Sequence, residues 1–410
     1  MGFEKAYDVV LQSCKIQFPV RSSNYQLFQM PRKLFVLAGE VSGDMHAAGV
    51  VGELLRRKPD VRIFGIGGEQ LRALGAELAY DTRQMSIMGF ADVLRHAGFL
   101  RKVIIALKAL VRDEKPDAAL LVDYPGMNLL MARFLHDLGI PVIYYIAPQV
   151  WAWKEGRVRK IRETVDRLLV IFDFEVDFYR RHGVKAEFVG HPVIEELRHE
   201  VFSPAPSFLQ QHGIDEGATL IGLLPGSRRQ EITMLLPEML RAAGLLGKRH
   251  NAVFLLGRAP RLDYRWQDYM TEPEGIRVVE CRGYEVMQYS SLALVTSGTA
   301  TLEALCFGRP MIVVYRTGWL NYQIGKRLVK LRSISLANIV ARGLGSAERV
   351  VPELIQHEAC AERMAEAVLE LLENPEKAQV MRAELLAARQ KLASNAPSEA
   401  VSTVIEQYLH

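Results

Sequence analysis

A short apolar strand, followed by a small-residue turn and a helix, recurs along this chain and restricts its fold more than any other feature. In the first half the apolar runs begin at Lys33, Val61, Ala118, Val142 and Leu168. These runs do not alternate apolar with polar residues, which indicates strands that are buried on both faces. Strands of this kind, separated by helical segments, predict a parallel sheet covered by helices on both sides.

The pattern lapses over residues 197–217 and then resumes. The later apolar runs begin at Thr219, Ala252, Ile276, Leu292 and Met311. We therefore predict an α/β chain with two doubly wound, Rossmann-like domains that face each other across a cleft. The predicted parts are an N-terminal extension 1–31, a first domain 32–196, a second domain 197–375, and C-terminal helices 376–410 that return to the first domain.

Composition narrows the class of protein. A chain of 410 residues is long enough for two domains, and 49% hydrophobic with 24% charged residues argues against a disordered chain. The formal net charge of +4 is too small for a dedicated nucleic-acid binder, so we expect no nucleic-acid partner. Four separated cysteines and the lack of a long apolar run favour a cytoplasmic protein without a membrane span.

Two turns of the second half have the composition of phosphate-binding turns. Ser297, Gly298 and Thr299 lie between a strand and a helix, where free backbone N–H groups and the helix dipole attract anions. Glu303, in the first turns of that helix, is a candidate to accept hydrogen bonds from ribose hydroxyls. The alternative is an ordinary helix cap.

The other turn, residues 225–231, carries Arg228, whose guanidinium suits phosphate oxygens. The alternative there is a surface arginine paired with Glu231. The presence of two such turns in one half favours a diphosphate ligand, whereas either turn alone would be weak evidence for it.

Asp123 stands at the end of an apolar strand in the first half. A carboxylate at this edge of the sheet can take a proton from a hydroxyl nucleophile. The alternative is that Asp123 only caps the next helix. Dinucleotide, Walker A, zinc-protease and serine-hydrolase motifs are absent, and no Asp-x-Asp triplet occurs. We therefore expect no cofactor and no metal, with arginine and helix dipoles neutralising a diphosphate.

Three further features have two interpretations each. The aromatic and basic stretch from Pro148 to Lys160 suits sugars, lipid headgroups or nucleic acid, or it is core packing beside a solvated face. The basic amphipathic segments Arg95–Arg112 and Gly325–Arg332 suit an anionic membrane, although a crossover helix has the same pattern. His191, at the predicted domain junction, is a structural residue or a cleft residue.

Taken in chain order, several strings resemble the lipid-A-disaccharide synthase family. The strings are Ala38-Gly-Glu-Val-Ser-Gly-Asp44, Ser86-Ile-Met-Gly-Phe90, Asp123-Tyr-Pro-Gly-Met-Asn128, Pro148-Gln-Val-Trp-Ala-Trp153, Gly190-His-Pro192, Leu223-Leu-Pro-Gly-Ser-Arg228 and Ser297-Gly-Thr-Ala-Thr-Leu-Glu303. The resemblance covers residue 32 to the end of the chain.

This resemblance implies a GT-B glycosyltransferase of lipopolysaccharide synthesis in Gram-negative bacteria. Such an enzyme joins UDP-2,3-diacylglucosamine to 2,3-diacylglucosamine 1-phosphate, forms a β(1→6) disaccharide with inversion, and releases UDP. The resemblance also implies a metal-independent enzyme, peripheral on the cytoplasmic face of the inner membrane.

The resemblance assigns roles residue by residue. It implies that Asp123 is the general base, Arg228 the diphosphate clamp, Ser297 to Thr299 the phosphate turn and Glu303 the ribose anchor. Further substrate-binding positions carried over in this way are Ser42, Met88, Gly89, His191 and Asn338.

The chain departs from the family pattern at some positions. Gly126 and Met127 stand where the family usually has Asp and Phe, Ala337 where Pro is usual, and Gln149 where Ser is usual. None of these is a proposed base or clamp. The rival interpretations are a UDP-GlcNAc 2-epimerase, a peptidoglycan GlcNAc-transferase, and a non-enzymatic lipid- or nucleic-acid-binding scaffold, which would release no UDP.

Overall fold

The computed structural model describes residues 31–86, 97–152, 155–247, 251–258, 262–270, 275–319, 322–323, 327, 331–393 and 396–409. The chain divides into two compact units, Met1–Pro31 and Arg32–His410. All described residues except Pro31 belong to the second unit. The predicted site residues Met88 and Gly89 lie outside the described residues.

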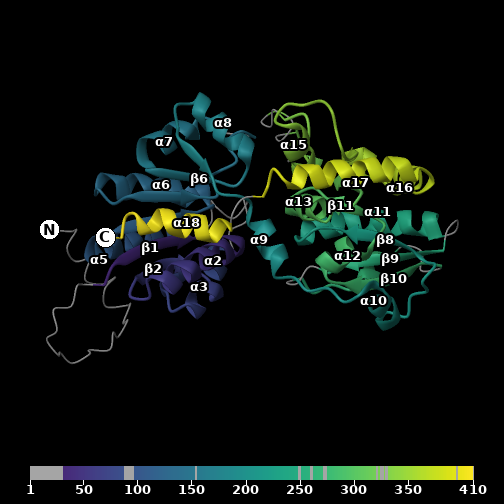
Figure 1. Ribbon diagram of the computed structural model, residues 1–410, viewed down its shortest axis with the longest axis horizontal. Helices are drawn as coiled ribbons and strands as arrows, with labels where there is room; N and C mark the ends of the chain where they lie inside the picture. Colours follow the sequence, from purple (N-terminus) through teal and green to yellow (C-terminus); the bar gives the residue numbers. More distant parts are fainter. Residues whose placement is uncertain are drawn as a thin grey trace. The chain divides into compact units, whose positions relative to one another are not determined.

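The first half of the chain forms a parallel sheet of strand order β3-β2-β1-β4-β5-β6-β7 (Figure 1). Its strands are β1 (Lys33–Ala38), β2 (Arg62–Gly67), β3 (Glu77–Asp81), β4 (Ala118–Val122), β5 (Val142–Tyr145), β6 (Arg167–Val170) and β7 (Ala186–Phe188). Its helices are α2 (Val41–Arg57), α3 (Glu69–Ala73), α4 (Thr82–Ser86), α5 (Ala97–Glu114), α6 (Pro125–Asp137), α7 (Arg157–Thr164), α8 (Asp173–Arg181) and α9 (Pro192–Arg198). Every residue of the central strand β4 is buried, as the apolar runs predicted.

The second half forms another parallel sheet, of order β10-β9-β8-β11-β12-β13. Its strands are β8 (Thr219–Leu224), β9 (Ala252–Gly257), β10 (Arg277–Cys281), β11 (Leu292–Thr296), β12 (Met311–Tyr315) and β13 (Glu353–Ile355). Its helices are α10 (Ala205–Gln211), α11 (Arg229–Gly247), α12 (Gly283–Tyr289), α13 (Thr299–Cys306), α15 (Leu336–Arg342), α16 (Ala361–Glu373), α17 (Pro375–Arg389) and the short 3-10 helices η1 (Trp266–Tyr269) and η2 (Gln356–Glu358). The predicted pair of doubly wound sheets is confirmed.

In each sheet the order of strands reverses at one point, and ligands of doubly wound folds bind beside that point. In the first sheet it lies between β1 and β4, which pair in parallel. The turn after β1 therefore adjoins the turn that contains Asp123. In the second sheet it lies between β8 and β11, so the turn with Arg228 adjoins the turn with Ser297. The four turns that carry Ser42, Asp123, Arg228 and Ser297 thus form two pairs.

The C-terminal tail divides between the two sheets (Figure 1). Helix α17 packs against α13 and α15 of the second half, whereas α18 (Pro397–Glu406) packs against α2 of the first. Val401 and Ile405 of α18 are fully buried. Helix α18 therefore packs with the first sheet's helices, and α17 packs with those of the second.

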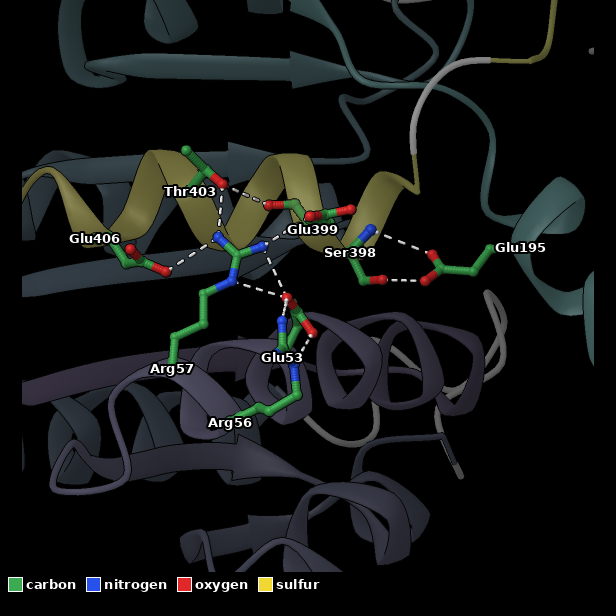
Figure 2. Close-up of polar contacts among 8 residues, drawn as sticks. All are labelled: Glu53, Arg56, Arg57, Glu195, Ser398, Glu399, Thr403 and Glu406. Carbon is green, nitrogen blue, oxygen red and sulfur yellow. Dashed lines mark hydrogen bonds and ion pairs between the residues drawn. The ribbon is translucent and has the colours of Figure 1, made fainter.

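Polar contacts link α18 to α2 and to α9, as Figure 2 shows. The Arg57 guanidinium of α2 donates to Thr403 at 2.9 Å, to Glu399 at 3.2 Å and to Glu406 at 3.3 Å. Ser398, at the start of α18, donates its backbone N–H and its hydroxyl to the Glu195 carboxylate of α9. These contacts join the end of the chain to the first sheet and to the helix that precedes the second half.

The amphipathic helix α5 packs as a crossover helix. Val103, Leu107 and Val111 are fully buried, whereas 54% of Ile105 is exposed. Arg101 and Lys102 are exposed on the same helix. The apolar stripe expected at a membrane therefore faces the protein core, and Ile105 is the large apolar side chain that α5 exposes. None of the described helices is long and apolar enough to cross a membrane.

Candidate active site

The turn after β4 holds Asp123 in an unusual backbone conformation. Asp123 and Tyr124 have φ of 48° and 44°, a region that residues other than glycine rarely adopt. The carbonyl oxygen of Asp123 accepts hydrogen bonds from the Tyr144 hydroxyl at 2.7 Å and from Nδ2 of Asn128 at 2.5 Å. Strain of this kind persists only where surrounding contacts hold it, and it is frequent at functional sites.

The turn after β1 is shaped to fit against this strained turn. A Cβ atom on Gly39 would lie 2.4 Å from Cδ1 of Tyr124, so only glycine allows the tyrosine ring to pack there. The next residue, Glu40, lies close enough for its charge to act on Asp123. Burial, and then the Glu40 carboxylate, raise the pKa of Asp123 to about 6. A carboxylate with this pKa is mostly ionised at neutral pH and is a stronger base than an ordinary aspartate.

Two other residues of the Ala38–Asp44 string differ in their surroundings. The buried Asp44 carboxylate accepts hydrogen bonds from the backbone N–H groups of Gly68 at 2.6 Å, Gln70 at 3.0 Å and Leu71 at 3.3 Å. Asp44 therefore caps the start of α3. Ser42, in contrast, is exposed in the first turn of α2. Of these two residues, only Ser42 is open to a ligand.

The turns of the second half surround a cavity of about 520 Å³. Predicted residues that line it are Arg228, Ser297, Gly298, Thr299 and Glu303. The other lining residues are Glu200, Leu224, Gly226, Ser227, Glu231, Gly257, Arg258, Arg282, Gly283, Tyr284, Met287, Thr296 and Ala300. A pocket of this size is in the range of small-molecule sites, and its lining combines apolar surface with arginines and one helix N-terminus.

Arg228 reaches into this cavity from an exposed position, with 82% of its side chain accessible. Its Nη1 atom lies 3.3 Å from Oε1 of Glu231, and the same carboxylate accepts the backbone N–H groups of Ser227 and Arg228. The pairing with Glu231 that we considered as an alternative is therefore present. It leaves most of the guanidinium accessible from the cavity.

The Ser297 turn differs from an ordinary helix cap. The Ser297 hydroxyl donates to the carbonyl of Ile334 at 2.9 Å, and Gly298, with φ of 144°, is the cap residue of α13. As a glycine, Gly298 has no side chain of its own to cap the N-terminus of α13. The start of this helix, with its partial positive charge, faces the cavity in the place where we predicted a phosphate.

Glu303 lies farther along α13, on the wall of the same cavity. Burial, followed by the nearby Glu196 carboxylate, raises the pKa of Glu303 to about 7, while a hydrogen bond from Tyr284 lowers it. At neutral pH the carboxyl group is therefore close to its midpoint. Ionised, it can accept two hydroxyl groups, as a ribose anchor must.

Asn338 and His191 are not among the residues that line the cavity. The amide oxygen of Asn338 accepts from the backbone N–H groups of Val350 and Val351, and its Nδ2 donates to the carbonyl of Val351 and to Glu353, both at 2.9 Å. The buried His191 caps α9 by accepting from Val193 N–H at 3.2 Å, and burial lowers its pKa to about 3. In this structure both side chains bond within the protein.

Asn338 is nevertheless connected to the phosphate turn. The buried Glu353 carboxylate accepts from Asn338, from the Ser333 hydroxyl and from the backbone N–H groups of Ile334 and Ser335. Ile334 in turn accepts the Ser297 hydroxyl. Asn338 and Glu353 thus hold the segment against which the Ser297 turn rests.

Trp151 of the aromatic stretch belongs to the core. Its indole N–H donates to the buried Glu175 at 2.9 Å, and its ring packs edge-on against Phe172 and Phe174. Trp153 and Lys154 lie outside the described residues. Nowhere in the described part of the chain do three or more His, Cys, Asp or Glu side chains gather in a way that could hold a metal ion.

Comparison with known proteins identifies the family. A family model described as lipid-A-disaccharide synthetase matches residues 34–404. The chain belongs to this family. The lipid-A-disaccharide synthase of Geobacter metallireducens is 41% identical over 384 residues, which are 92% of this chain and 97% of that protein. The synthase of Myxococcus xanthus is 43% identical over 343 residues, which are 82% and 87% of the two chains.

Solved structures with the same fold belong to proteins with different activities. A Staphylococcus aureus MnaA–UDP complex has a TM-score of 0.62 at 13% identity and covers 92% of this chain and 97% of its own. The calicheamicin glycosyltransferase CalG4 has a TM-score of 0.58 at 17% identity, with 93% and 99% covered. The UDP-GlcNAc 2-epimerase of Neisseria meningitidis has a TM-score of 0.55 at 15% identity, with 92% and 98% covered. At these identities the likeness concerns the fold alone, so the epimerase alternative gains nothing from it.

The resemblance inferred from the sequence strings to the lipid-A-disaccharide synthase family is confirmed. Two residues of the site were nevertheless missed by sequence reasoning. Glu40 was quoted in a string without a role, and only the pairing of β1 with β4 brings it to Asp123. Tyr284 carried no motif signal, and it reaches Glu303 because α12 and α13 pack together.

Proposed function

We propose that this member of the lipid-A-disaccharide synthase family joins UDP-2,3-diacylglucosamine to 2,3-diacylglucosamine 1-phosphate, forming a β(1→6) disaccharide 1-phosphate and releasing UDP. The observation that carries the proposal is the strained Asp123 turn, in which partial burial and the Glu40 carboxylate raise the pKa of Asp123 to about 6. The family membership supplies the substrate class.

In the proposed reaction Asp123 removes the proton from the acceptor 6-hydroxyl as the oxygen attacks the anomeric carbon. The bond to the UDP oxygen breaks on the opposite face, which inverts the configuration. Glu40 contributes by keeping Asp123 basic, because its negative charge disfavours a second ionised carboxylate nearby. A base whose pKa lies just below neutral pH is ionised in most molecules and still accepts a proton readily.

The donor is assigned to the cavity of the second half. The diphosphate is placed at the start of α13 and beside Arg228, where the helix dipole and the guanidinium offset the charge that develops on departing UDP. The ribose hydroxyls are assigned to Glu303. The family resemblance still supports five further substrate-binding positions, namely Ser42, Met88, Gly89, His191 and Asn338. For His191 and Asn338, the hydrogen bonds described above favour a role in supporting the site.

We also propose that the protein docks peripherally on the cytoplasmic face of the inner membrane, since both sugars carry acyl chains. The exposed Ile105, with Arg101 and Lys102 on the same helix, supports this choice of surface. Pelleting with vesicles that contain phosphatidylglycerol should weaken in Ile105→Glu and stay unchanged in the control Leu245→Glu, an exposed leucine of α11. Leu107→Glu cannot serve as this test, because Leu107 is fully buried and the fold would suffer.

The decisive experiment for the activity is an assay of UDP release with each substrate alone and with both together. We expect UDP and a disaccharide 1-phosphate only when both acylated sugars are present. The proposed reaction would be overturned if the rate of UDP release were the same with and without the acceptor, or if the donor were recovered as its C2 epimer.

A further inference from the structure

Two carboxylates meet at one tyrosine hydroxyl on the wall of the nucleotide cavity. Tyr284 of α12 donates toward Oε2 of Glu196 at 3.4 Å, and it also forms a hydrogen bond with Glu303 of α13. Glu196 belongs to α9, the helix between the two sheets. This cluster therefore joins the predicted ribose anchor to the segment that links the two halves of the chain.

Among the residues that the structure describes, the cationic groups nearest to the two carboxylates are either neutral or already paired. Nδ1 of His46 lies 3.5 Å from Oε1 of Glu196, but burial lowers the pKa of His46 to about 4, so the imidazole is neutral at neutral pH. On the same wall Arg282 already pairs with Glu200 at 3.0 Å and with Glu285 at 3.2 Å. Among the described residues, the other titratable groups that interact with the cluster are Glu195 and Tyr145 at Glu196, Glu200 at Tyr284, His191 at His46, and Cys306 at Glu303.

A phenol hydroxyl has one proton to donate and lone pairs to accept. It can therefore donate to one ionised carboxylate while it accepts from a protonated one, but it cannot donate to two ionised carboxylates at once. Burial also disfavours two neighbouring negative charges. In agreement, the pKa values of both Glu196 and Glu303 are raised.

We propose that Glu196 is a positioning residue that shares one proton with Glu303 through the Tyr284 hydroxyl, and that binding of a uridine nucleotide at Glu303 expels this proton. The inference rests on the proposed role of Glu303 as the ribose anchor. Ribose hydroxyls donate to a carboxylate and thus favour its ionised form. Binding consequently requires that the shared proton leave the pair, and nucleotide affinity falls as the pH falls through the midpoint of Glu303.

The test is a titration of the full-length protein with UDP by calorimetry, between about pH 5.5 and pH 8.5, a range that brackets the midpoint. UDP itself gains a proton in the lower part of this range, as phosphate monoesters do, and this contribution is the same for every variant. The difference between variants therefore isolates the protein groups. Thermal unfolding of each variant without ligand controls for damage to the fold.

Glu196→Gln removes one of the two negative charges, so Glu303 ionises more readily. We expect this variant to bind UDP at about pH 6 more tightly than the unmodified protein does, by threefold or more, and to bind it equally at about pH 8.5. Tyr284→Phe removes a donor from Glu303 and should shift the pH curve in the opposite direction. Glu303→Gln should leave only the pH dependence of UDP itself.

Glu195→Gln is the matched control. It makes the same change of charge on the same helix, but Glu195 bonds to Ser398 of α18 rather than to the cluster. Because Glu195 acts on Glu196 only through its charge, we expect the midpoint to move much less than it does in Glu196→Gln. A purely structural role for Glu196 would lower affinity at every pH and leave the midpoint in place.

The failures of the two proposals are distinguishable. If UDP binds and Glu196→Gln keeps the midpoint of the unmodified protein, proton sharing is wrong and the nucleotide site stands. If Glu303→Gln keeps the full pH dependence, Glu303 is not the titrating group and the inference is overturned. If the unmodified protein binds no UDP at any pH, the proposed function fails and the inference fails with it.

Discussion

The carboxyl edges of the two sheets have the same topology but carry residues of opposite charge character. In the first sheet the paired turns after β1 and β4 bring together two carboxylates, Glu40 and Asp123, on a strained backbone. In the second sheet the paired turns after β8 and β11 present small residues, a helix N-terminus and the exposed Arg228 around a cavity. One edge is suited to taking a proton and the other to holding an anion.

This difference teaches that the switch point of a doubly wound sheet determines where a site lies but not what it does. The chemistry follows from the residues that the turns carry. In the first sheet, Gly39 lets Tyr124 pack against the turn, and the strained conformation is held by Asn128 and Tyr144. In the second, the N-cap residue of α13 is Gly298, which has no side chain to cap the helix. The two edges should therefore fail in different ways when they are altered.

The largest effect is expected for Asp123→Asn. The amide keeps the size of the side chain but cannot accept the proton of the acceptor hydroxyl, so turnover should fall by about a thousandfold. UDP affinity should stay within about twofold of its original value, because no residue of the second sheet is altered. Steady-state UDP release and calorimetric UDP binding measure the two quantities separately. Normal turnover in this variant would refute the assignment of the base.

The next largest effect concerns Asn338, which holds the segment against which the Ser297 turn of the second sheet rests. Asn338→Ala leaves the buried N–H groups of Val350 and Val351 without their acceptor. The free energy of unfolding should fall by about 3 kcal/mol, since buried unpaired polar groups are costly. Urea unfolding measures this loss. A variant of unchanged stability that binds the donor poorly would instead show that Asn338 contacts the ligand directly.

Sequence alone predicted the two sheets because each strand is a local apolar run followed by a local turn. It missed the edge strands β3 and β13, of which β3 is half exposed and β13 is only three residues long. For the site, sequence predicted Asp123, Arg228 and Ser297 just after strands, and Glu303 on the helix that follows Ser297. It could not reveal which of the buried polar groups bond to one another.

Asn338 and Leu107 illustrate that limit. The four hydrogen bonds of Asn338 reach residues 12 to 15 positions away, across a segment with no regular period. The amphipathic pattern of α5 is the same for a helix on a sheet and a helix on a membrane, and only the packed structure shows that Leu107 faces the core. Both the hydrogen-bond partners of Asn338 and the orientation of Leu107 depend on packing between residues that are distant in the sequence.

The pH dependence of turnover separates the first edge from the second. The pKa of Asp123 is raised to about 6, so the base is ionised above this pH and protonated below it. With donor saturating, kcat/KM for the acceptor should be level above pH 7 and fall about tenfold per pH unit well below pH 6. Glu40→Gln removes a negative charge beside Asp123 and should move the midpoint to lower pH. A midpoint that does not move in Glu40→Gln would contradict the proposed electrostatic role of Glu40.

The smallest of these effects is expected for Arg228→Ala, and it belongs to the second edge alone. Arg228 is largely exposed and forms an ion pair with Glu231. Solvent and this ion pair both weaken the attraction between its guanidinium and a phosphate. UDP affinity should therefore fall by only about tenfold, while the pH midpoint that reports Asp123 stays in place.

Arg229→Ala is the matched control for Arg228→Ala, because Arg229 is the next residue, is equally a guanidinium, and does not line the nucleotide cavity. It should leave UDP affinity unchanged. If both substitutions weakened binding equally, the effect would be one of general surface charge, and Arg228 would lose its role as the clamp. If only Arg228→Ala weakened binding and the Asp123 midpoint moved as well, the two edges would not be independent, and the division into a proton-accepting edge and an anion-holding edge would have to be abandoned.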